Sequence, residues 1–204
     1  MDTAWPFATG KAPFKVKGIA YAFHMEYVKS EIPGGLAAQN AHFENAALAR
    51  FFEQPFFATS WYDVYPLMQA GHACGAATHE SFEEFVRRRG RHQVKKDLGL
   101  VRRALVRMLS PATLATRVPQ INATYFDFVK VETRVESKHS VEGFCRGLPG
   151  AVLRWYQLVT ETFLDEVMAR SGADKRVIEW RPPRRAGEAH GIVIYDVGYH
   201  VYWD

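Results

Sequence analysis

The feature that most constrains the fold is a change in hydrophobic spacing at Tyr125. In the following segment, residues 125–139, small β-branched residues alternate with charged ones. The two series are Val129, Val131, Thr133 and Val135, and Lys130, Glu132, Arg134 and Glu136. A period of two is typical of a strand with one buried and one solvent-facing side. It predicts an antiparallel sheet in the second half of the chain.

The residues before Tyr125 have mostly helical spacing. Residues 36–54 carry apolar side chains at i, i+4 intervals, which predicts an amphipathic helix ended by Pro55. A second helix is expected from Trp61 to about Ala76. The exception is residues 15–23, KVKGIAYAF, whose alternation predicts a short strand at the edge of a sheet.

Further helix signals follow up to Pro119. Ser81 and Glu84 form a capping box, so a third helix should begin at Phe82. An apolar stripe then runs through Leu98, Val101, Leu105, Met108 and Leu109. Ser110 before Pro111 predicts an N-cap and a first helical residue, and Pro119 is expected to end that helix.

The end of the chain predicts one long helix and two strands. The helix stripe is Leu148, Val152, Trp155, Val159, Phe163 and Val167, closed by Gly172. Residues 175–183 and 190–203 read as strands joined by the polar loop 182–189. We therefore expect an α+β fold within one domain, 1–204: a helical part, about 15–124, followed by a small antiparallel sheet with a long packed helix, about 125–204.

The bulk properties indicate a globular protein of the cytoplasm. The chain has 204 residues, of which 48% are hydrophobic, enough for one sizeable core. It has neither a secretory signal pattern nor a run of eighteen apolar residues, so we expect no membrane span. Its two cysteines, Cys74 and Cys145, form no CxxC pair, which fits free thiols in a reducing compartment.

Several segments together resemble an uncharacterised myxobacterial paralogous family. They are VKGIAYAF, ATSWYDVYPLMQA, GRHQVKKDLGLVRRALVRMLSP and RVPQINATYFDF. The second half also resembles the vinyl-reductase-like and haem-NO-binding domains, in which helices and a curved antiparallel sheet enclose a ligand. This resemblance implies a ligand-binding, sensory fold. Two departures stand out: the tyrosine-x-serine-x-arginine signature of the haem domain is absent, and the segment 191–204 lacks the cysteines of many vinyl-reductase-like domains.

Three kinds of chemical site can be weighed from the residues. His72, Cys74 and His79 offer zinc ligands, but a structural site needs four and no second pair follows. Haem needs an axial ligand in an apolar cavity, for which His72 and His139 have the more suggestive settings. No common catalytic motif occurs, and His190, Asp196 and His200 are the candidates for an acid–base set. We assign no metal, assume no cofactor, leave haem open, and favour a protein that is not an enzyme.

One charged block is concentrated enough to suggest a partner. The formal net charge is +4, and nine basic residues lie between positions 86 and 107 against the single acid Asp97. Such a block could contact phosphates or an acidic protein, but it lacks interleaved aromatic residues and is interrupted by Gly90 and Gly99. We expect a solvated helix face and no direct binding of nucleic acid.

The aromatic residues provide the functional hypothesis. We expect rings from distant segments to wall a pocket between the helices and the sheet, because Trp and Tyr combine apolar area with a polar tip. The predicted pocket residues are Trp61, Tyr65, His72, Tyr125 and Trp155, with Cys74 and Cys145 as secondary candidates. The sequence thus predicts a sensory or regulatory domain that binds a small, mostly apolar molecule and signals to a partner protein. The alternatives are a haem-based gas sensor and an interaction protein or nucleic-acid-associated regulator that uses the basic face 86–107; a homodimer is left open.

Overall fold

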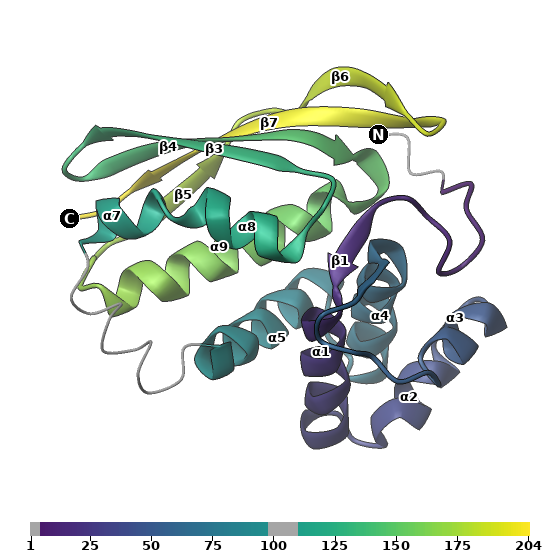
Figure 1. Ribbon diagram of the computed structural model, residues 1–204. Helices are drawn as coiled ribbons and strands as arrows, with labels where there is room; N and C mark the ends of the chain where they lie inside the picture. The colour runs from purple at the N-terminus through teal and green to yellow at the C-terminus, as the bar shows by residue number, and fades with distance from the viewer. Residues whose placement is uncertain (1–4, 98–109) are drawn as a thin grey trace.

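The structure is a computed structural model that describes residues 5–97 and 110–204 (Figure 1). The apolar stripe predicted from Leu98 to Leu109 lies outside the described residues. The described chain has the α+β architecture expected from the sequence, with helices gathered in the N-terminal part and an antiparallel sheet in the C-terminal part.

The N-terminal part consists of helices around a short two-stranded sheet. In chain order its elements are β1 (Lys15–Lys17), α1 (Gly18–Glu31), α2 (Gly35–Ala41), α3 (Ala46–Phe51), β2 (Trp61–Asp63), α4 (Val64–Ala77) and α5 (Phe82–Asp97). Strands β1 and β2 pair antiparallel, with Val16 opposite Tyr62. They bring the beginning of α1 and the beginning of α4 together.

The strand predicted for residues 15–23 is correct only as far as Lys17. From Gly18 the chain is helical, and α1 buries Ala20, Tyr21, His24, Tyr27 and Val28, a helical spacing that includes polar rings. Gly18 is required at the turn, because a Cβ there would lie 2.0 Å from the Phe57 carbonyl oxygen. The sequence does not reveal the helix after Gly18, because its buried face includes the polar residues His24 and Tyr27 and therefore lacks a clear apolar stripe.

Two predicted helices are shorter than expected. The segment 36–54 forms α2 and α3, separated at residues 42–45, where the side chain of Asn45 caps α3 by accepting from the Ala47 N–H. The helix predicted from Trp61 begins at Val64, because Trp61–Asp63 pairs with β1 and Asp63 caps α4 by accepting from the Tyr65 N–H. The capping box at the start of α5 is confirmed, since the Ser81 hydroxyl accepts from the Glu84 N–H and the Glu84 carboxylate accepts from the Ser81 N–H.

The C-terminal part holds the main sheet. Its elements are α7 (Pro111–Ala115), α8 (Val118–Tyr125), β3 (Lys130–Ser137), β4 (Ser140–Pro149), the 3-10 helix η1 (Gly150–Val152), α9 (Leu153–Arg170), β5 (Val177–Trp180), β6 (Arg184–Ala189) and β7 (Ile192–Tyr202). The strand order is β3-β4-β7-β5, with β6 also paired to β7, and all pairs are antiparallel.

The sheet is larger than the sequence predicts. Strand β4 is absent from the sequence prediction, and Leu148, which the prediction places in the long helix, is a buried residue of β4 opposite Tyr195. Strand β6 lies inside the predicted polar loop, because pairing with β7 needs backbone groups and no apolar side chains. Ser110 does cap α7, whereas Pro119 lies in the first turn of α8, which begins at Val118, instead of ending a helix.

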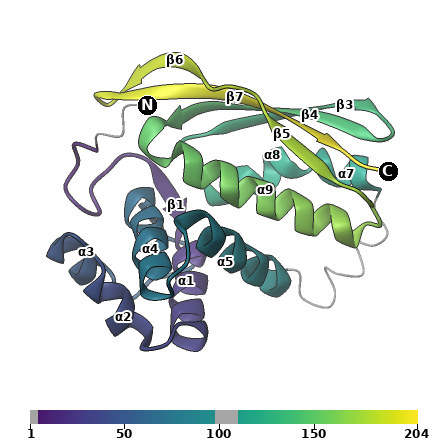
Figure 2. The ribbon, with the colours of Figure 1, turned by 180° about the vertical axis from the view of Figure 1, so that it is seen from behind.

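The helices form layers on one face of the sheet (Figures 1 and 2). Helices α7, α8 and α9 lie along this face, and α1 to α5 lie beyond α9. On β7, alternate side chains at Val197, Tyr199 and Val201 are buried toward the helices. The Tyr199 ring occupies the space above Gly143 of β4, where a Cβ would lie 2.1 Å from it. One hydrophobic core contains residues of both parts of the chain.

Candidate functional site

A cavity of about 80 Å³ lies where the N-terminal helices meet the C-terminal part. Most of its described lining comes from α5, α8 and α9, with single residues from β1, α1 and α4. The cavity therefore lies among helices, and none of the lining described belongs to the five-stranded sheet. The sequence placed the pocket between helices and sheet, but that layer is filled by Tyr156, Tyr199, Cys145 and their buried neighbours.

The wall of the cavity follows the spacing of its helices. On α9, Trp155, Val159 and Phe163 are four residues apart and share one face. On α8, Val118, Asn122 and Tyr125 are spaced at i, i+4 and i+7 and project to the same side. This spacing brings large apolar side chains to the cavity from two helices.

Helices α5 and α9 approach closely beside the cavity at Gly90. A Cβ on Gly90 would lie 3.0 Å from Cγ2 of Thr162 on α9. The missing side chain lets the two backbones come together at this point, while the larger residues Val94 and Phe163 line the cavity next to it. The contact between the two parts is thus tight at one position and open beside it.

Several polar groups of the cavity lining are bonded within the protein, whereas the buried Nε atom of Arg89 makes no hydrogen bond in the described part of the chain. The Tyr156 hydroxyl donates to Asn122 Oδ1 at 2.7 Å, and Asn122 Nδ2 donates to the Val129 carbonyl at 3.1 Å. Burial raises the pKa of Tyr156 well above its ordinary value, so this phenol stays neutral. Arg89 is buried at the cavity wall, and its Nη2 donates to the Ala20 carbonyl at 2.8 Å. These contacts fix Tyr156, Asn122 and one end of the Arg89 guanidinium, and most of the remaining surface of the cavity is apolar.

Two of the seven predicted pocket residues, Tyr125 and Trp155, line this cavity. Trp61 lies elsewhere on β2, with 40% of its surface exposed and the Lys17 ammonium 4.2 Å from its ring centroid. Tyr65 stacks on Trp5 with ring centroids 4.8 Å apart. His72 is exposed on α4 and stacks on Phe82 at 3.9 Å. The structure thus separates the aromatic residues of segment 55–80 from those of α8 and α9.

Both predicted cysteines are free and buried, and neither is among the described cavity lining. Cys145 lies on β4 behind Tyr156, with its Sγ 3.8 Å from the phenol oxygen. Cys74 lies on α4 and donates to Gln39 Oε1 at 3.3 Å. Burial raises the pKa of each thiol to about 12, so both are unreactive thiols in the native protein.

A buried polar cluster joins three helices of the N-terminal part. His24 Nε2 lies 2.7 Å from Gln39 Oε1, which also accepts from Cys74. All three residues are at most 1% exposed. Burial, and then the charge of Arg89, lower the pKa of His24 to about 3, which keeps its imidazole neutral. His72 and Cys74, two of the predicted zinc ligands, have different surroundings on α4, one exposed and one within this cluster.

Sequence reasoning missed most of the residues that line the cavity. It assigns Val159 and Phe163 to the helix stripe as core and gives Asn122 no role. The signal at Asn122 is a polar residue on the apolar face of a short helix, spaced with Val118 and Tyr125. In the sequence Gly90 is interpreted as an interruption of the basic block. In the structure it lets α5 approach α9 closely at Thr162.

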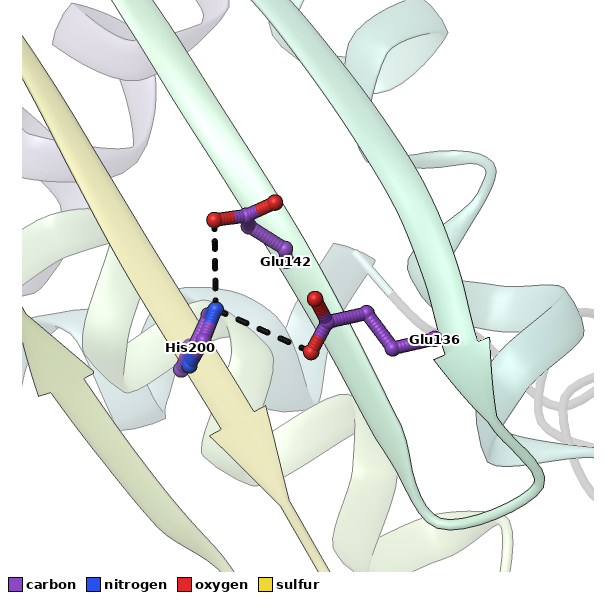
Figure 3. Close-up of side chains that lie close together, drawn as sticks. All are labelled: Glu136, Glu142 and His200. Carbon is purple, nitrogen blue, oxygen red and sulfur yellow. Dashed lines mark ion pairs between the residues drawn. The ribbon is translucent and has the colours of Figure 1, made fainter.

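Glu136, Glu142 and His200 form a group on the outer face of the sheet (Figure 3). The His200 Nε2 atom lies 3.2 Å from Glu142 Oε1 and 3.7 Å from Glu136 Oε2. Three such atoms could in principle hold a metal ion, but Arg134 and Arg181 bind the two oxygens of Glu142. Arg181 Nη2 also lies 3.0 Å from His200 Nε2. The guanidinium groups of Arg134 and Arg181 thus supply the positive charge that a metal ion would bring. An ion-pair network is formed by Glu136, Glu142, His200 and these two arginines.

The predicted acid–base set on the last hairpin is engaged in separate contacts. The His190 ring packs edge-on against Phe14, at 5.6 Å between centroids. Asp196 accepts from the Gly147 N–H at 3.1 Å, and His200 belongs to the ion-pair network. These contacts favour structural roles for all three side chains.

The described part of the basic block is largely used within the protein. Arg87 pairs with Glu161 at 3.3 Å, Arg88 pairs with Glu80 at 3.0 Å, and Arg89 is buried. Lys96 pairs with Glu26. Arg102, Arg103 and Arg107 lie outside the described residues. Each of these ion pairs neutralises a basic side chain. Fewer basic side chains are therefore available to contact phosphates than the composition of the block suggests.

Comparisons with known proteins identify the fold. No family model matches the chain, and no curated protein matches it. Solved structures of H-NOX domains do match over nearly its whole length. A structure from a study of haem distortion in the H-NOX family has a TM-score of 0.64 at 10% identity, covering 92% of this chain and 95% of that one. An oxygen-binding H-NOX domain related to soluble guanylate cyclases, in its oxygen complex, has a TM-score of 0.64 at 8% identity over the same shares.

A third match is an Fe(II) unliganded H-NOX mutant from K. algicida, with a TM-score of 0.60 at 11% identity, covering 92% of this chain and 96% of that one. At such low identity these likenesses establish the fold alone. The haem-NO-binding-like architecture predicted from the sequence is therefore confirmed. The resemblances to a myxobacterial family and to vinyl-reductase-like domains stay predictions. Among the described helices, none is long and apolar enough to cross a bilayer.

Proposed function

We propose that this protein is a sensory or regulatory domain that binds a small apolar molecule in the cavity between α5, α8 and α9. The observation that carries the proposal is the position of this cavity at the junction of the two parts, inside a fold whose solved examples include an oxygen-binding domain. Its volume of about 80 Å³ is several times the roughly 10–15 Å³ that a single water needs.

The lining supports a ligand without strong hydrogen-bonding groups. Asn122 and Tyr156 bond to each other, so a polar guest would have to break a buried hydrogen bond to reach them. The rest of the wall is dominated by aliphatic and aromatic side chains such as Val159, Phe163 and Trp155. A dry apolar cavity of about 150 Å³, roughly twice this volume, binds xenon and benzene. The ligand class is therefore an apolar molecule of a few heavy atoms.

Signalling follows from the elements that the ligand would touch. Helix α5 belongs to the N-terminal part, whereas α8 and α9 pack under the main sheet. A ligand that contacts both sides stabilises one arrangement of the parts by its difference in affinity between arrangements. A partner protein would read the changed surface. The two free thiols support the reducing cytoplasm as the place of action.

The haem-based alternative has the more direct support from the solved structures, because two of those cited name haem or Fe(II). The residues of this cavity do not fit haem. The described lining contains no His, Cys or Met, and the hydroxyl of its Tyr156 is already bonded to Asn122. The sequence 98–109 contains Met108 but neither His nor Cys. The volume is also well below the roughly 300 Å³ at the low end for drug-sized ligands. We therefore keep the apolar ligand as the main proposal.

Xenon is a suitable probe for the cavity. We expect ¹²⁹Xe NMR of the purified protein to give a bound-xenon shift that saturates with pressure. Val159→Phe places extra ring atoms in the cavity from a half-buried position, so it should weaken xenon binding about tenfold or more. Val177→Phe is the matched control, because Val177 is 48% exposed on β5 and outside the cavity lining. Equal xenon binding by both variants would refute the site.

Haem is tested separately by absorption spectroscopy. Protein expressed with added haem precursor, and apoprotein mixed with hemin, should give no stoichiometric Soret band that changes on adding carbon monoxide. A stoichiometric band with a carbon monoxide shift would establish the haem-based alternative. It would also show that the cavity opens beyond the volume described above.

A further inference from the structure

The outer edge of the main sheet has a sequence that is complementary to itself. Strand β3 is the last strand in the sheet order and pairs with β4 alone among the strands described. Its far side therefore presents backbone groups to which another strand can bond. Figure 1 places β3 at the edge of the sheet, with α7 and α8 beneath it.

The charged residues of β3 alternate in sign along the solvent-facing side. They are Lys130, Glu132, Arg134 and Glu136, and all four are exposed. In an antiparallel pairing of two β3 strands about a two-fold axis at Thr133, Glu132 lies opposite Arg134 of the second copy. Lys130 lies opposite Glu136 of the second copy, at the register shift that β3 has between Val135 and Ser137. The symmetry repeats both contacts, so four opposite-charge pairs form. Cross-strand pairs of this kind are stabilising, and like charges directly opposite are destabilising.

The other side of the strand is complementary in the same register. Val135 is 45% exposed and is one of the few large hydrophobic residues of the described chain with that exposure. The two-fold axis at Thr133 places it opposite Val131 of the second copy, and the two threonines face each other. Burial of these valines adds an apolar contribution to the backbone hydrogen bonds.

Neighbouring registers are disfavoured by the same charges. Moving the axis to Glu132 sets that residue against itself and Lys130 against Arg134. Moving it to Arg134 sets that residue against itself and Glu132 against Glu136. A shift by a single position in pairing would turn the valines to the opposite side of the sheet. One register is therefore selected over most of the strand.

We propose that β3 is a homodimer interface, in which two copies pair antiparallel through residues 130–136 about a two-fold axis at Thr133 and join their sheets into one. Edge strands often carry charges and bulges that prevent such pairing, and β3 has both, but its alternating signs let the charges of two antiparallel copies match. An interface of one strand lies at the small end of interface areas, so the dimer is in exchange with the monomer. This proposal does not depend on the ligand proposed for the cavity.

Charge reversal at one pair gives a sharp test. Lys130 makes no ion pair in the described part of the chain, so its reversal should leave the fold intact. Glu136 pairs with exposed Arg134 and with half-buried His200, so its reversal removes two contacts of the ion-pair network, and the folding of this variant is checked separately. Lys130→Glu alone puts carboxylates opposite each other in the dimer, and Glu136→Lys alone puts ammonium groups opposite each other. When the two variants are mixed, a heterodimer of one chain of each has opposite charges at both contacts between positions 130 and 136.

Sedimentation equilibrium of the full chain should be measured from about 10 µM to about 1 mM, a range that spans weak dimer affinities. We expect the wild-type mass to rise toward the dimer and each single variant to dimerise about tenfold more weakly, as two like-charge contacts imply. The equimolar mixture should return to wild-type behaviour. Circular dichroism checks that each variant is folded.

Glu188→Lys is the matched control, since Glu188 is exposed on β6 at a different edge and should leave association unchanged. A wild-type mass that stays monomeric throughout would overturn the proposal. So would a mixture that associates no better than its components, or a control variant as impaired as the β3 variants.

Discussion

At the scale of single residues, the buried polar groups carry the most specific information. Tyr156, Asn122, His24 and Gln39 are at most 8% exposed, and each has at least one hydrogen-bond partner in the protein. A buried polar atom that loses its partner keeps the desolvation penalty without the bond that offset it. These residues are therefore where small substitutions have large effects.

Tyr156→Phe tests the hydrogen bond behind the cavity. The variant keeps the ring but leaves Asn122 Oδ1 without the donor that lies 2.7 Å away, so it should lower the free energy of unfolding by about 1–3 kcal/mol. Urea denaturation followed by circular dichroism measures the change. Tyr202→Phe, on an exposed tyrosine, should change it by less than about 0.5 kcal/mol. Equal losses in the two variants would mean that the buried bond has no special weight.

His24 predicts a pH dependence of stability. Its pKa is about 3 in the folded protein and about 6.5 when unfolded, so between these values only the unfolded chain binds the proton. The contribution of neutral His24 is thus complete above pH 6.5 and is lost as the pH falls toward 3, with a slope of up to about 1.4 kcal/mol per pH unit. Denaturation of wild type and His24→Gln at several pH values measures it.

The difference between wild type and His24→Gln should shrink as the pH falls through this window, because the variant has no imidazole to protonate. His42→Gln, on an exposed histidine, serves as the control. A pH profile of His24→Gln that runs parallel to the wild type would contradict the assignment of this slope to His24.

At the scale of elements, the sequence predicts local signals well and element boundaries less well. The capping box at Ser81, the N-cap at Ser110 and the alternation of β3 all reappear in the structure, because each depends on neighbouring residues. Strand β6 is not predicted, because it is formed by backbone pairing with β7 and has no apolar alternation of its own. Helix α1 is not predicted, because its buried face includes the polar residues His24 and Tyr27. Such features depend on contacts distant in sequence.

The candidate site was harder to predict than the fold for the same reason. Tyr125 and Trp155 lie on elements that meet at the cavity, whereas Trp61 belongs to a strand edge and His72 to an exposed helix face. The presence of an aromatic residue in the sequence does not show in which direction its side chain points. The packing of α5, α8 and α9 against one another decides which rings face the cavity.

At the scale of the whole molecule, the core argues for one cooperative unit. A single hydrophobic cluster includes Phe14, Tyr21 and Val64 of the N-terminal part and Leu148, Leu153 and Tyr199 of the C-terminal part. We propose that residues 1–204 unfold as one domain. Urea transitions followed by tryptophan fluorescence and by far-ultraviolet circular dichroism should then coincide, with the same midpoint and slope. Two separated transitions would indicate that the helical part and the sheet fold independently.

The close approach of Gly90 to Thr162 has a mechanical consequence. At this point only the Thr162 side chain lies between the two helix backbones, and the cavity begins directly beside the contact. A ligand in the cavity would touch both helices next to the position where they are in contact, so we expect its binding to change the tilt of α5 against α9. In this way a ligand of only a few atoms would change the angle between the N-terminal helices and the C-terminal part that holds the main sheet.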